Sequence, residues 1–339
     1  MKDKKLELPV VDDTRIWDAW LALYDAPAIS VALELEVFES LTEPASAEVL
    51  AKRLGFSIRG LAALLSMLNI LELLDKRDDE YQLTTLSRHY MLKDSPYFWG
   101  GLFSRVASTL PMHQMLLDNV RDDSTEIARA ADGWESGHLS AEEARTVTDF
   151  MHSHSVASAV GLAHTCDFSK NRKILDVGGG SGCFSIALAQ HYEQLNCTVM
   201  DLPTICTVAE EYIARAGVSD RVNATSVDMF RENWPKGYDG HFFSNIFHDW
   251  SLETCADLAK SSFDALESGG SIYLQEMLLN DDGDGPKTAV AFSILMCLGT
   301  KGQQFTFAQL EDILSKAGFK EIKAQPSYGY YSLVSGKKL

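Results

Sequence analysis

The feature that most constrains the fold is a regular alternation of short apolar segments and amphipathic helices beyond Lys173. The apolar segments predict strands at 174–177, ending at 201, ending near 228, and at 240–246 and 271–276, with helices at 209–216, 254–266 and 307–317 and a last strand pair. Such alternation is typical of a mostly parallel sheet with helices on both faces. Ligands bind beyond the carboxyl ends of the strands in these sheets, so the residues just after each strand are the candidates for a site.

The chain before Lys173 is predicted to be helical. Apolar residues recur at helical spacing over 16–24 and 31–41, and a helical pattern also runs from about Tyr97 to Phe168. Between them lie a helix at 46–54, a turn at 55–57, a helix from 58 to about 74 and two short strands around a polar turn at 75–80. This order of elements predicts a winged-helix unit.

A winged helix often binds DNA, but this one lacks the side chains for it. Its second helix carries Arg59 as its one basic residue, whereas base readout needs polar and basic groups. The chain has 48 acidic against 30 basic residues, and the net charge of −18 disfavours nucleic acid and anionic membranes as partners. We therefore expect an apolar dimerisation domain that covers part of a pocket. An acidic regulator that binds a small ligand is the less favoured alternative.

The 339 residues are enough for two domains. No apolar run approaches the ~18 residues of a membrane span, and the charged N-terminus is not followed by a secretory signal, so we expect a cytoplasmic protein. The cysteines contain no CxxC pair and are expected to be buried, reduced thiols: Cys166, Cys183, Cys197, Cys206, Cys255 and Cys297.

A glycine-rich turn, Gly178 to Gly182, follows the first strand of the predicted sheet. Glycines there let the backbone turn tightly and let a ligand lie against it, with a helix N-terminus behind. A dinucleotide fingerprint would need a third glycine where Cys183 stands, which disfavours an NAD-dependent reductase. An acid, Asp176, two residues before the G-x-G-x-G pattern instead matches a methyltransferase nucleotide loop.

Two more acids stand at successive strand ends. Asp201 ends the second strand about twenty residues on, where a carboxylate can bind both ribose hydroxyls. Asp228 ends the third strand and can accept a hydrogen bond from an adenine amino group, while Met229 and Phe230 flank the ring. Each acid alone is commonly a helix cap or a turn residue, but three at successive strand ends favour a nucleoside site.

His248 follows the fourth strand, on the ligand side of the sheet. An oxygen that attacks a methyl sulfonium must lose its proton, and an imidazole is suited to act as the general base toward a phenol. Glu276, at the end of the fifth strand, can hold the imidazole in one tautomer and stabilise its protonated form. A simple cap is the alternative role for Glu276.

These motifs resemble those of the bacterial and plant small-molecule O-methyltransferases that depend on S-adenosylmethionine. That family joins a winged-helix dimerisation domain to a class I methyltransferase domain with a Rossmann-like α/β sheet. The resemblance covers nearly the whole chain and rests on the segments 177–182, 201–203, 228–230 and 248–250 in the family's order. It implies a homodimer with a dimerisation domain at 1–105, a helical linker and substrate lid at 106–168, and a cofactor-binding domain at 169–339.

The resemblance also implies residue roles. His248 would be the general base flanked by Glu276, and a small hydroxylated, aromatic metabolite would be the acceptor. The segment 151–155 resembles a helix that touches acceptor and cofactor. The cofactor would be bound by Gly178, Gly180, Asp201, Leu202, Asp228, Met229, Phe230, Ser244 and Ser155, and the acceptor by Met151 and His154.

Two positions depart from the plant members of the family. Gln304 replaces a second glutamate beside the base, and an amide stabilises an imidazolium less than a carboxylate does. Ser244 stands where some plant members have a lysine. Methylation of carbon or nitrogen, and non-methylating chemistry, remain alternatives, although the retained His248 favours oxygen. We expect no metal, because 281–285 is typical of an exposed loop and no cluster with ligand spacing is present.

Overall fold

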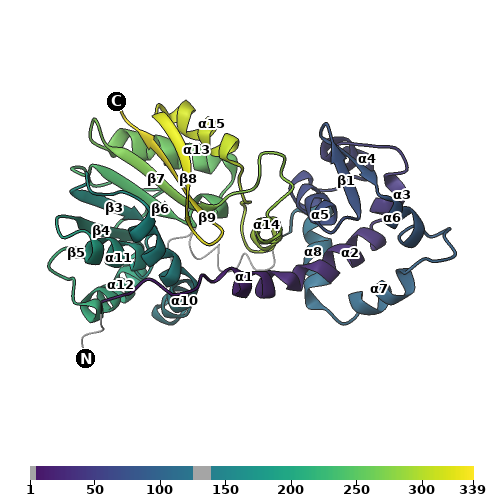
Figure 1. The fold of residues 1–339 in the computed structure, drawn as a ribbon, viewed down its shortest axis with the longest axis horizontal. Coiled ribbons are helices and arrows are strands. Elements are labelled where there is room, and N and C mark those ends of the chain that lie inside the picture. The colour runs from purple at the N-terminus through teal and green to yellow at the C-terminus, as the bar shows by residue number, and fades with distance from the viewer. Residues whose placement is uncertain (1–4, 125–138) are drawn as a thin grey trace. The chain divides into compact units, whose positions relative to one another are not determined.

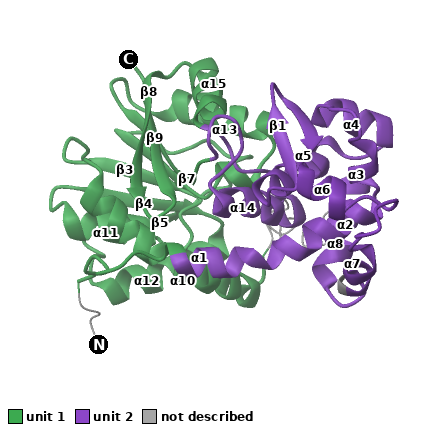
Figure 2. Ribbon diagram, turned by 45° about the vertical axis from the view of Figure 1, so that its right-hand side comes forward, with its two compact units in different colours: residues 1–14, 132–278, 307–339 green, residues 15–131, 279–306 purple. Residues whose placement is uncertain are grey.

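The computed structural model describes residues 5–124 and 139–339, and the chain forms two compact units that are each discontinuous in sequence (Figures 1 and 2). Unit 1 comprises residues 1–14, 132–278 and 307–339, and unit 2 comprises residues 15–131 and 279–306. Part of the helical stretch expected over 97–168 lies outside the described residues. No helix in the described ranges is long and apolar enough to cross a membrane.

Unit 1 is built on a seven-stranded sheet in the order β5-β4-β3-β6-β7-β9-β8. The five strands from β5 to β7 are parallel, and the last two are antiparallel to their neighbours, as expected for a mostly parallel sheet with a final strand pair. The strands are β3 (Lys173–Val177), β4 (Asn196–Asp201), β5 (Val222–Ser226), β6 (Gly240–Ser244), β7 (Ser271–Met277), β8 (Lys320–Tyr328) and β9 (Tyr331–Lys337).

Helices cover both faces of this sheet. Four successive residues of β3 are buried, and successive strand residues point to opposite faces, so neither face of β3 is open to solvent. Phe242 on β6 packs with Phe168 and Phe184 in the core between sheet and helices. The helices are α10 (Ala141–Thr165), α11 (Cys183–His191), α12 (Pro203–Ala216), α13 (Leu252–Ala265) and α15 (Phe307–Ala317), with the short 3-10 helix η3 (Phe247–Asp249) after β6 (Figure 1).

Local sequence explains where these helices begin and end. Ser140 and Glu143 form a capping box at the start of α10, and Ser251 caps α13 through the Thr254 N–H. Pro203 occupies the first turn of α12, and Gly217 ends that helix at φ +73°. These signals end each helix before the next strand begins. Because β3, β4, β5, β6 and β7 are parallel, their carboxyl ends lie at one edge of the sheet.

Unit 2 is helical with one small hairpin. The expected helix, turn, helix and hairpin are present. Ser46 and Ser57 cap the two helices, and Gly55 ends the first helix at φ +73°. Its elements are α1 (Thr14–Leu21), η1 (Ala22–Tyr24), α2 (Asp25–Glu34), α3 (Val37–Ser40), α4 (Ala47–Leu54), α5 (Ile58–Ile70), β1 (Leu74–Arg77), β2 (Glu80–Leu83), α6 (Thr85–Tyr90), α7 (Gly100–Ala107), α8 (Pro111–Asp122) and α14 (Lys287–Gly299).

Helix α14, far along the chain, belongs to this unit. Phe292 packs against Trp17 at 5.6 Å between ring centroids, and Thr288 donates a hydrogen bond to Asp18 at 2.6 Å. All six cysteines are free and buried, as expected.

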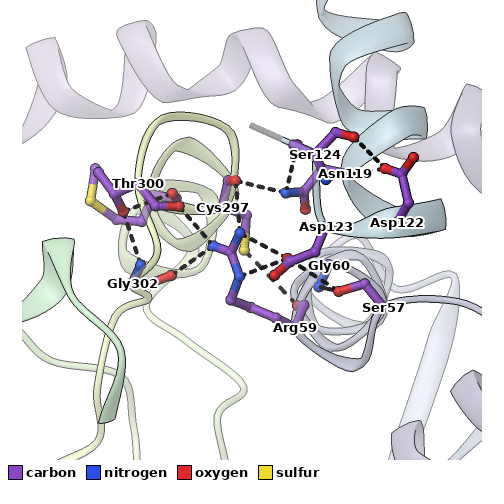
Figure 3. Close-up of polar contacts among 11 residues, drawn as sticks. Ser57, Arg59, Gly60, Asn119, Asp122, Asp123, Ser124, Cys297, Thr300 and Gly302 are labelled. Carbon is purple, nitrogen blue, oxygen red and sulfur yellow. Dashed lines mark hydrogen bonds and ion pairs between the residues drawn. The ribbon is translucent and has the colours of Figure 1, made fainter. Parts of the chain in front are cut away.

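Arg59 on α5 binds the carboxyl end of α14 (Figure 3). Its guanidinium donates to the carbonyl oxygens of Cys297, Thr300 and Gly302 at 3.1–3.3 Å and pairs with Asp123 at 2.8 Å. The last carbonyls of a helix lack partners within the helix, so a cation suits this place. Arg59, the one basic residue of α5, thus holds the turn that follows α14 within unit 2.

We expect Arg59→Met to lower the free energy of unfolding by roughly 2–4 kcal/mol, because the carbonyls and Asp123 lose a charged donor together. Chemical denaturation measures the loss, and hydrogen exchange should accelerate at Gly302. Arg53→Met is the matched control, since Arg53 makes a single exposed hydrogen bond to the Ser40 carbonyl. Equal effects of the two substitutions would show that Arg59 does not hold this turn.

Candidate active site

A cavity of about 150 Å³, open to solvent, lies in unit 1 at the carboxyl ends of β3, β4, β5 and β6. Most of the cofactor and acceptor residues expected from the sequence line it: Gly178, Gly180, Asp201, Leu202, Asp228, Met229, Phe230, Ser244, Ser155 and Met151. His248, Glu276 and His154 are not among its lining residues. Residues to which no role was assigned from the sequence also line it, including Thr148, His152, Ser181, Asn245 and Asp249.

The glycine turn brings backbone to the cavity wall. Gly178 and Gly180 have φ values of +67° and +56°, which side chains other than glycine rarely adopt. A Cβ on Gly178 would come within 2.5 Å of Ile246, whereas one on Gly180 would meet nothing within 4 Å. Gly178 therefore permits close packing against the turn after β6, and Gly180 leaves bare backbone beside open space.

Asp201 joins this turn to the end of β4. Its two oxygens accept hydrogen bonds from the N–H groups of Gly180 at 2.9 Å and Leu202 at 2.8 Å. Burial raises the pKa of Asp201 to about 6. Nearby Asp176 accepts a hydrogen bond from Ser185 at 2.7 Å, and burial, with a smaller contribution from Asp201, raises its pKa to about 7.

The turn after β5 is shaped by its own hydrogen bonds. Asp228 accepts from the Phe230 N–H at 2.9 Å and pairs with Arg231 at 3.0 Å. The Phe230 ring lies edge-on to Trp250, with centroids 4.6 Å apart, and stays 40% exposed. A carboxylate has about four acceptor positions, so Asp228 can still accept from a ligand.

Helix α10 contributes one face to the cavity: Thr148, Met151, His152 and Ser155. His152 hydrogen-bonds the Ser181 hydroxyl at 2.8 Å, which links this helix to the glycine turn. His154 instead packs against Phe150, and burial lowers its pKa to about 4. The i, i+3 and i+4 spacing back from Ser155 selects Met151 and His152, so helical periodicity is the signal that could have identified His152.

His248 lies between two acids. Its Nδ1 is 3.3 Å from Glu276 Oε2, and its Nε2 is 3.7 Å from Asp249 Oδ1. His248 and Glu276 are both buried, and Glu276 also accepts a hydrogen bond from the Phe247 N–H at 3.1 Å. Burial raises the pKa of Glu276 to about 8, with a further contribution from Asp249, and burial alone raises the pKa of Asp249 to about 8. The imidazole and both carboxyls thus form one cluster of titratable groups, of which Asp249 lines the cavity.

Gln304, expected beside the base, lies in unit 2. It is buried in the segment after α14, where its backbone N–H donates to Ser293 at 3.1 Å. Phe305 next to it accepts a backbone hydrogen bond from Leu279 at 2.9 Å. Across residues 5–124 and 139–339, no three His, Cys, Asp or Glu side chains are grouped so as to hold a metal ion.

Comparisons with known proteins identify the family of the chain. The O-methyltransferase domain family matches residues 113–320, and the O-methyltransferase dimerisation domain family matches residues 17–93. The chain is 33% identical over 332 residues to 3-hydroxy-5-methyl-1-naphthoate 3-O-methyltransferase of Streptomyces sahachiroi, covering 96% of this chain and 95% of that protein. The chain belongs to the S-adenosylmethionine-dependent O-methyltransferase family.

Two further relatives are informative. L-tyrosine C(3)-methyltransferase of Streptomyces lavendulae is 29% identical over 327 residues, covering 89% of this chain and 86% of that protein. The crystal structure of an O-methyltransferase family 2 protein from Planctomyces limnophilus, in complex with apigenin, superposes with a TM-score of 0.90 at 26% identity and covers 99% of each chain. The α/β fold with a dimerisation domain is therefore that of the class I O-methyltransferases.

The enzyme uses S-adenosylmethionine as its cofactor, and the cavity residues fit that molecule. Bare backbone at Gly180 leaves room for a ligand. Ser244 and Asn245 line the same cavity, and the Ser244 hydroxyl and the side-chain oxygen of Asn245 are buried without a hydrogen bond within the described part of the chain. Buried polar atoms are normally satisfied, so these two are suited to a polar ligand.

We expect the cofactor-free enzyme to lose stability as pH rises from 4 to 7, partly through Asp176. Folded Asp176 keeps its proton to about pH 7, whereas unfolded Asp176 loses it near 3.8, so the folded state binds more protons between these values. Asp176→Asn removes this contribution, at most about 1.4 kcal/mol per pH unit. Denaturation at several pH values measures it, with the exposed Asp220→Asn as control. An unchanged slope in Asp176→Asn would contradict the interpretation.

Proposed function

We propose that the enzyme transfers the methyl group of S-adenosylmethionine to a hydroxyl of a small aromatic metabolite, with His248 as general base. The observation that carries the proposal is the buried contact of His248 Nδ1 with Glu276, 3.3 Å away, at the carboxyl edge of the sheet. When Glu276 is ionised it can accept the Nδ1 proton, which leaves Nε2 as the nitrogen that accepts a proton.

The bound cofactor supplies an electrophilic methyl group on a sulfonium. His248 Nε2 accepts the acceptor's hydroxyl proton, and the positive imidazolium then lies beside Glu276 and Asp249. A buried carboxylate without a counter-charge is unfavourable, which is why the pKa values of both acids are raised. An imidazolium at His248 would compensate the charge of a carboxylate beside it.

We assign different parts of the cofactor to different strand ends. Asp228, Met229 and Phe230 after β5 would hold the adenine, and Asp201 with Leu202 at the end of β4 would hold the ribose hydroxyls. The remaining cofactor contacts are assigned to Gly178, Gly180, Ser244 and Ser155. Met151 and His154 are assigned to the acceptor. The support for this division is that all of these except His154 line one cavity.

The acceptor class follows from the relatives. The Streptomyces sahachiroi enzyme methylates a hydroxynaphthoate oxygen, the Streptomyces lavendulae enzyme a carbon of the tyrosine ring, and the Planctomyces limnophilus structure holds apigenin. All three molecules carry a phenolic hydroxyl whose deprotonation a histidine can assist. Methylation of ring carbon beside such a hydroxyl is therefore the second candidate reaction.

We expect His248→Gln to lower the methylation rate by about 10²–10⁴-fold, because the general base is lost, with little change in cofactor affinity. The assay follows isotope-labelled methyl transfer from S-adenosylmethionine to hydroxynaphthoates, tyrosine and apigenin by mass spectrometry. Glu276→Gln should lower the rate less, and His164→Gln, an exposed histidine on α10, should not.

Three outcomes bear on this proposal in different ways. A wild-type rate in His248→Gln would remove the base assignment. A product whose methyl is on carbon, as determined by NMR, would favour the second reaction. Loss of cofactor binding in His248→Gln would indicate structural damage instead of lost chemistry.

We also propose that the enzyme is a homodimer joined through unit 2. The dimerisation family matches residues 17–93 of this unit, and large apolar side chains are exposed on either side of that range at Ile16, Tyr97, Trp99 and Leu102. Light scattering should give twice the mass of the chain, and Trp99→Glu should shift the protein toward monomer because a charge is costly in an apolar interface. Leu252→Glu, at an exposed leucine of unit 1, is the control. A monomer in the wild type would refute the dimer.

A further inference from the structure

Asn245 has an unusual backbone conformation at the cavity wall. It follows the last residue of β6, and its N–H donates to the Gln275 carbonyl of β7 at 3.1 Å. Its φ of +53° is in the left-handed region, which residues other than glycine seldom adopt, although asparagine tolerates it better than most. Such conformations tend to persist where a side chain has a task.

The side chain of Asn245 is held at one end only. Its Nδ2 donates a hydrogen bond to the hydroxyl of Tyr331 on β9 at 3.2 Å, and Tyr331 is fully buried. Its Oδ1 is buried and accepts no hydrogen bond within the described residues. Asn245 lines the cavity, so its Oδ1 is a hydrogen-bond acceptor that is held in place and has no protein donor within the described residues.

The order of the strands indicates which part of the cofactor comes to this acceptor. Along the carboxyl edge the order is β5, β4, β3 and β6, and the first two strand ends carry Asp228 and Asp201. If these hold adenine and ribose, the methionyl part lies over the glycine turn toward β6. That part ends in an ammonium and a carboxylate, and only the ammonium can donate to Oδ1.

We propose that Asn245 is a cofactor-binding residue whose side-chain carbonyl accepts a hydrogen bond from the α-ammonium group of S-adenosylmethionine. This rests on the proposed placement of adenine and ribose. Tyr331 acts through Asn245 as a positioning residue, because its hydroxyl accepts the hydrogen bond of Nδ2 and so holds the amide in place.

The test is calorimetric binding of S-adenosylhomocysteine and of 5′-methylthioadenosine, which keeps the adenosine and lacks the amino acid part. Asn245→Gly should weaken S-adenosylhomocysteine binding by about 10–100-fold, the usual range for one charged hydrogen bond, and leave 5′-methylthioadenosine binding within about twofold. Glycine accepts φ +53° without strain, so this variant removes the amide and keeps the backbone.

Two more variants identify the chemistry. Asn245→Asp keeps an acceptor and should retain or tighten S-adenosylhomocysteine binding, whereas Asn245→Leu should weaken it as glycine does. Tyr331→Phe should give a smaller loss. Asn223→Leu, at an exposed asparagine at the start of β5, is the matched control.

Unchanged S-adenosylhomocysteine affinity in Asn245→Gly would overturn the proposal. An equal loss for both ligands would also overturn it, since the effect would then be structural, and weakening in Asn245→Asp would mean that the amide donates instead to the cofactor carboxylate. Failure of the wild type to bind 5′-methylthioadenosine while binding S-adenosylhomocysteine would instead count against the adenine and ribose placement.

Discussion

The hydrogen bond from the Gly180 N–H to Asp201 joins the glycine turn after β3 to the end of β4, and this wall of the cavity depends on it. The parallel ladder already brings these strand ends together, because the Gly178 N–H donates to the Met200 carbonyl at 2.8 Å. Beyond that bond the backbone must turn away from the sheet at positive φ, which only glycine does easily. The buried carboxyl of Asp201 then accepts hydrogen bonds from the N–H groups of Gly180 and Leu202, and burial raises its pKa.

The parts of this arrangement that arise from local sequence were predictable. Buried strands are short runs of apolar residues, and an acid or a glycine marks where each run ends. The predicted ends at Asp201 and Glu276 therefore fall at or within one residue of the ends of β4 and β7, and β5 ends at Ser226, two residues before Asp228. Because parallel strands end at one edge, placing Asp201 and Asp228 on one cavity followed from the same pattern, whereas Ser244 was assigned only through the family resemblance.

The parts that depend on contacts distant in sequence were not predictable. Nothing in the apolar pattern of 287–299 distinguishes a helix of unit 1 from one of unit 2, and its place is fixed by partners such as Arg59 and Trp17, over two hundred residues earlier. Asn245 is a similar case. An asparagine after a strand is an ordinary turn residue in sequence. Its amide is held in place by the hydroxyl of Tyr331, a residue that is distant in sequence.

The buried acids give the site one electrostatic character. Asp176, Asp201, Asp249 and Glu276 all have raised pKa values because burial opposes their charge. Such groups favour any positive charge placed beside them, whether an ammonium, a sulfonium or an imidazolium. In the mechanism proposed above, proton acceptance by His248 would create one such charge, and methyl transfer would remove another from the sulfur. The buried carboxyls of Asp249 and Glu276, which lie beside His248, would then stabilise the protonated base.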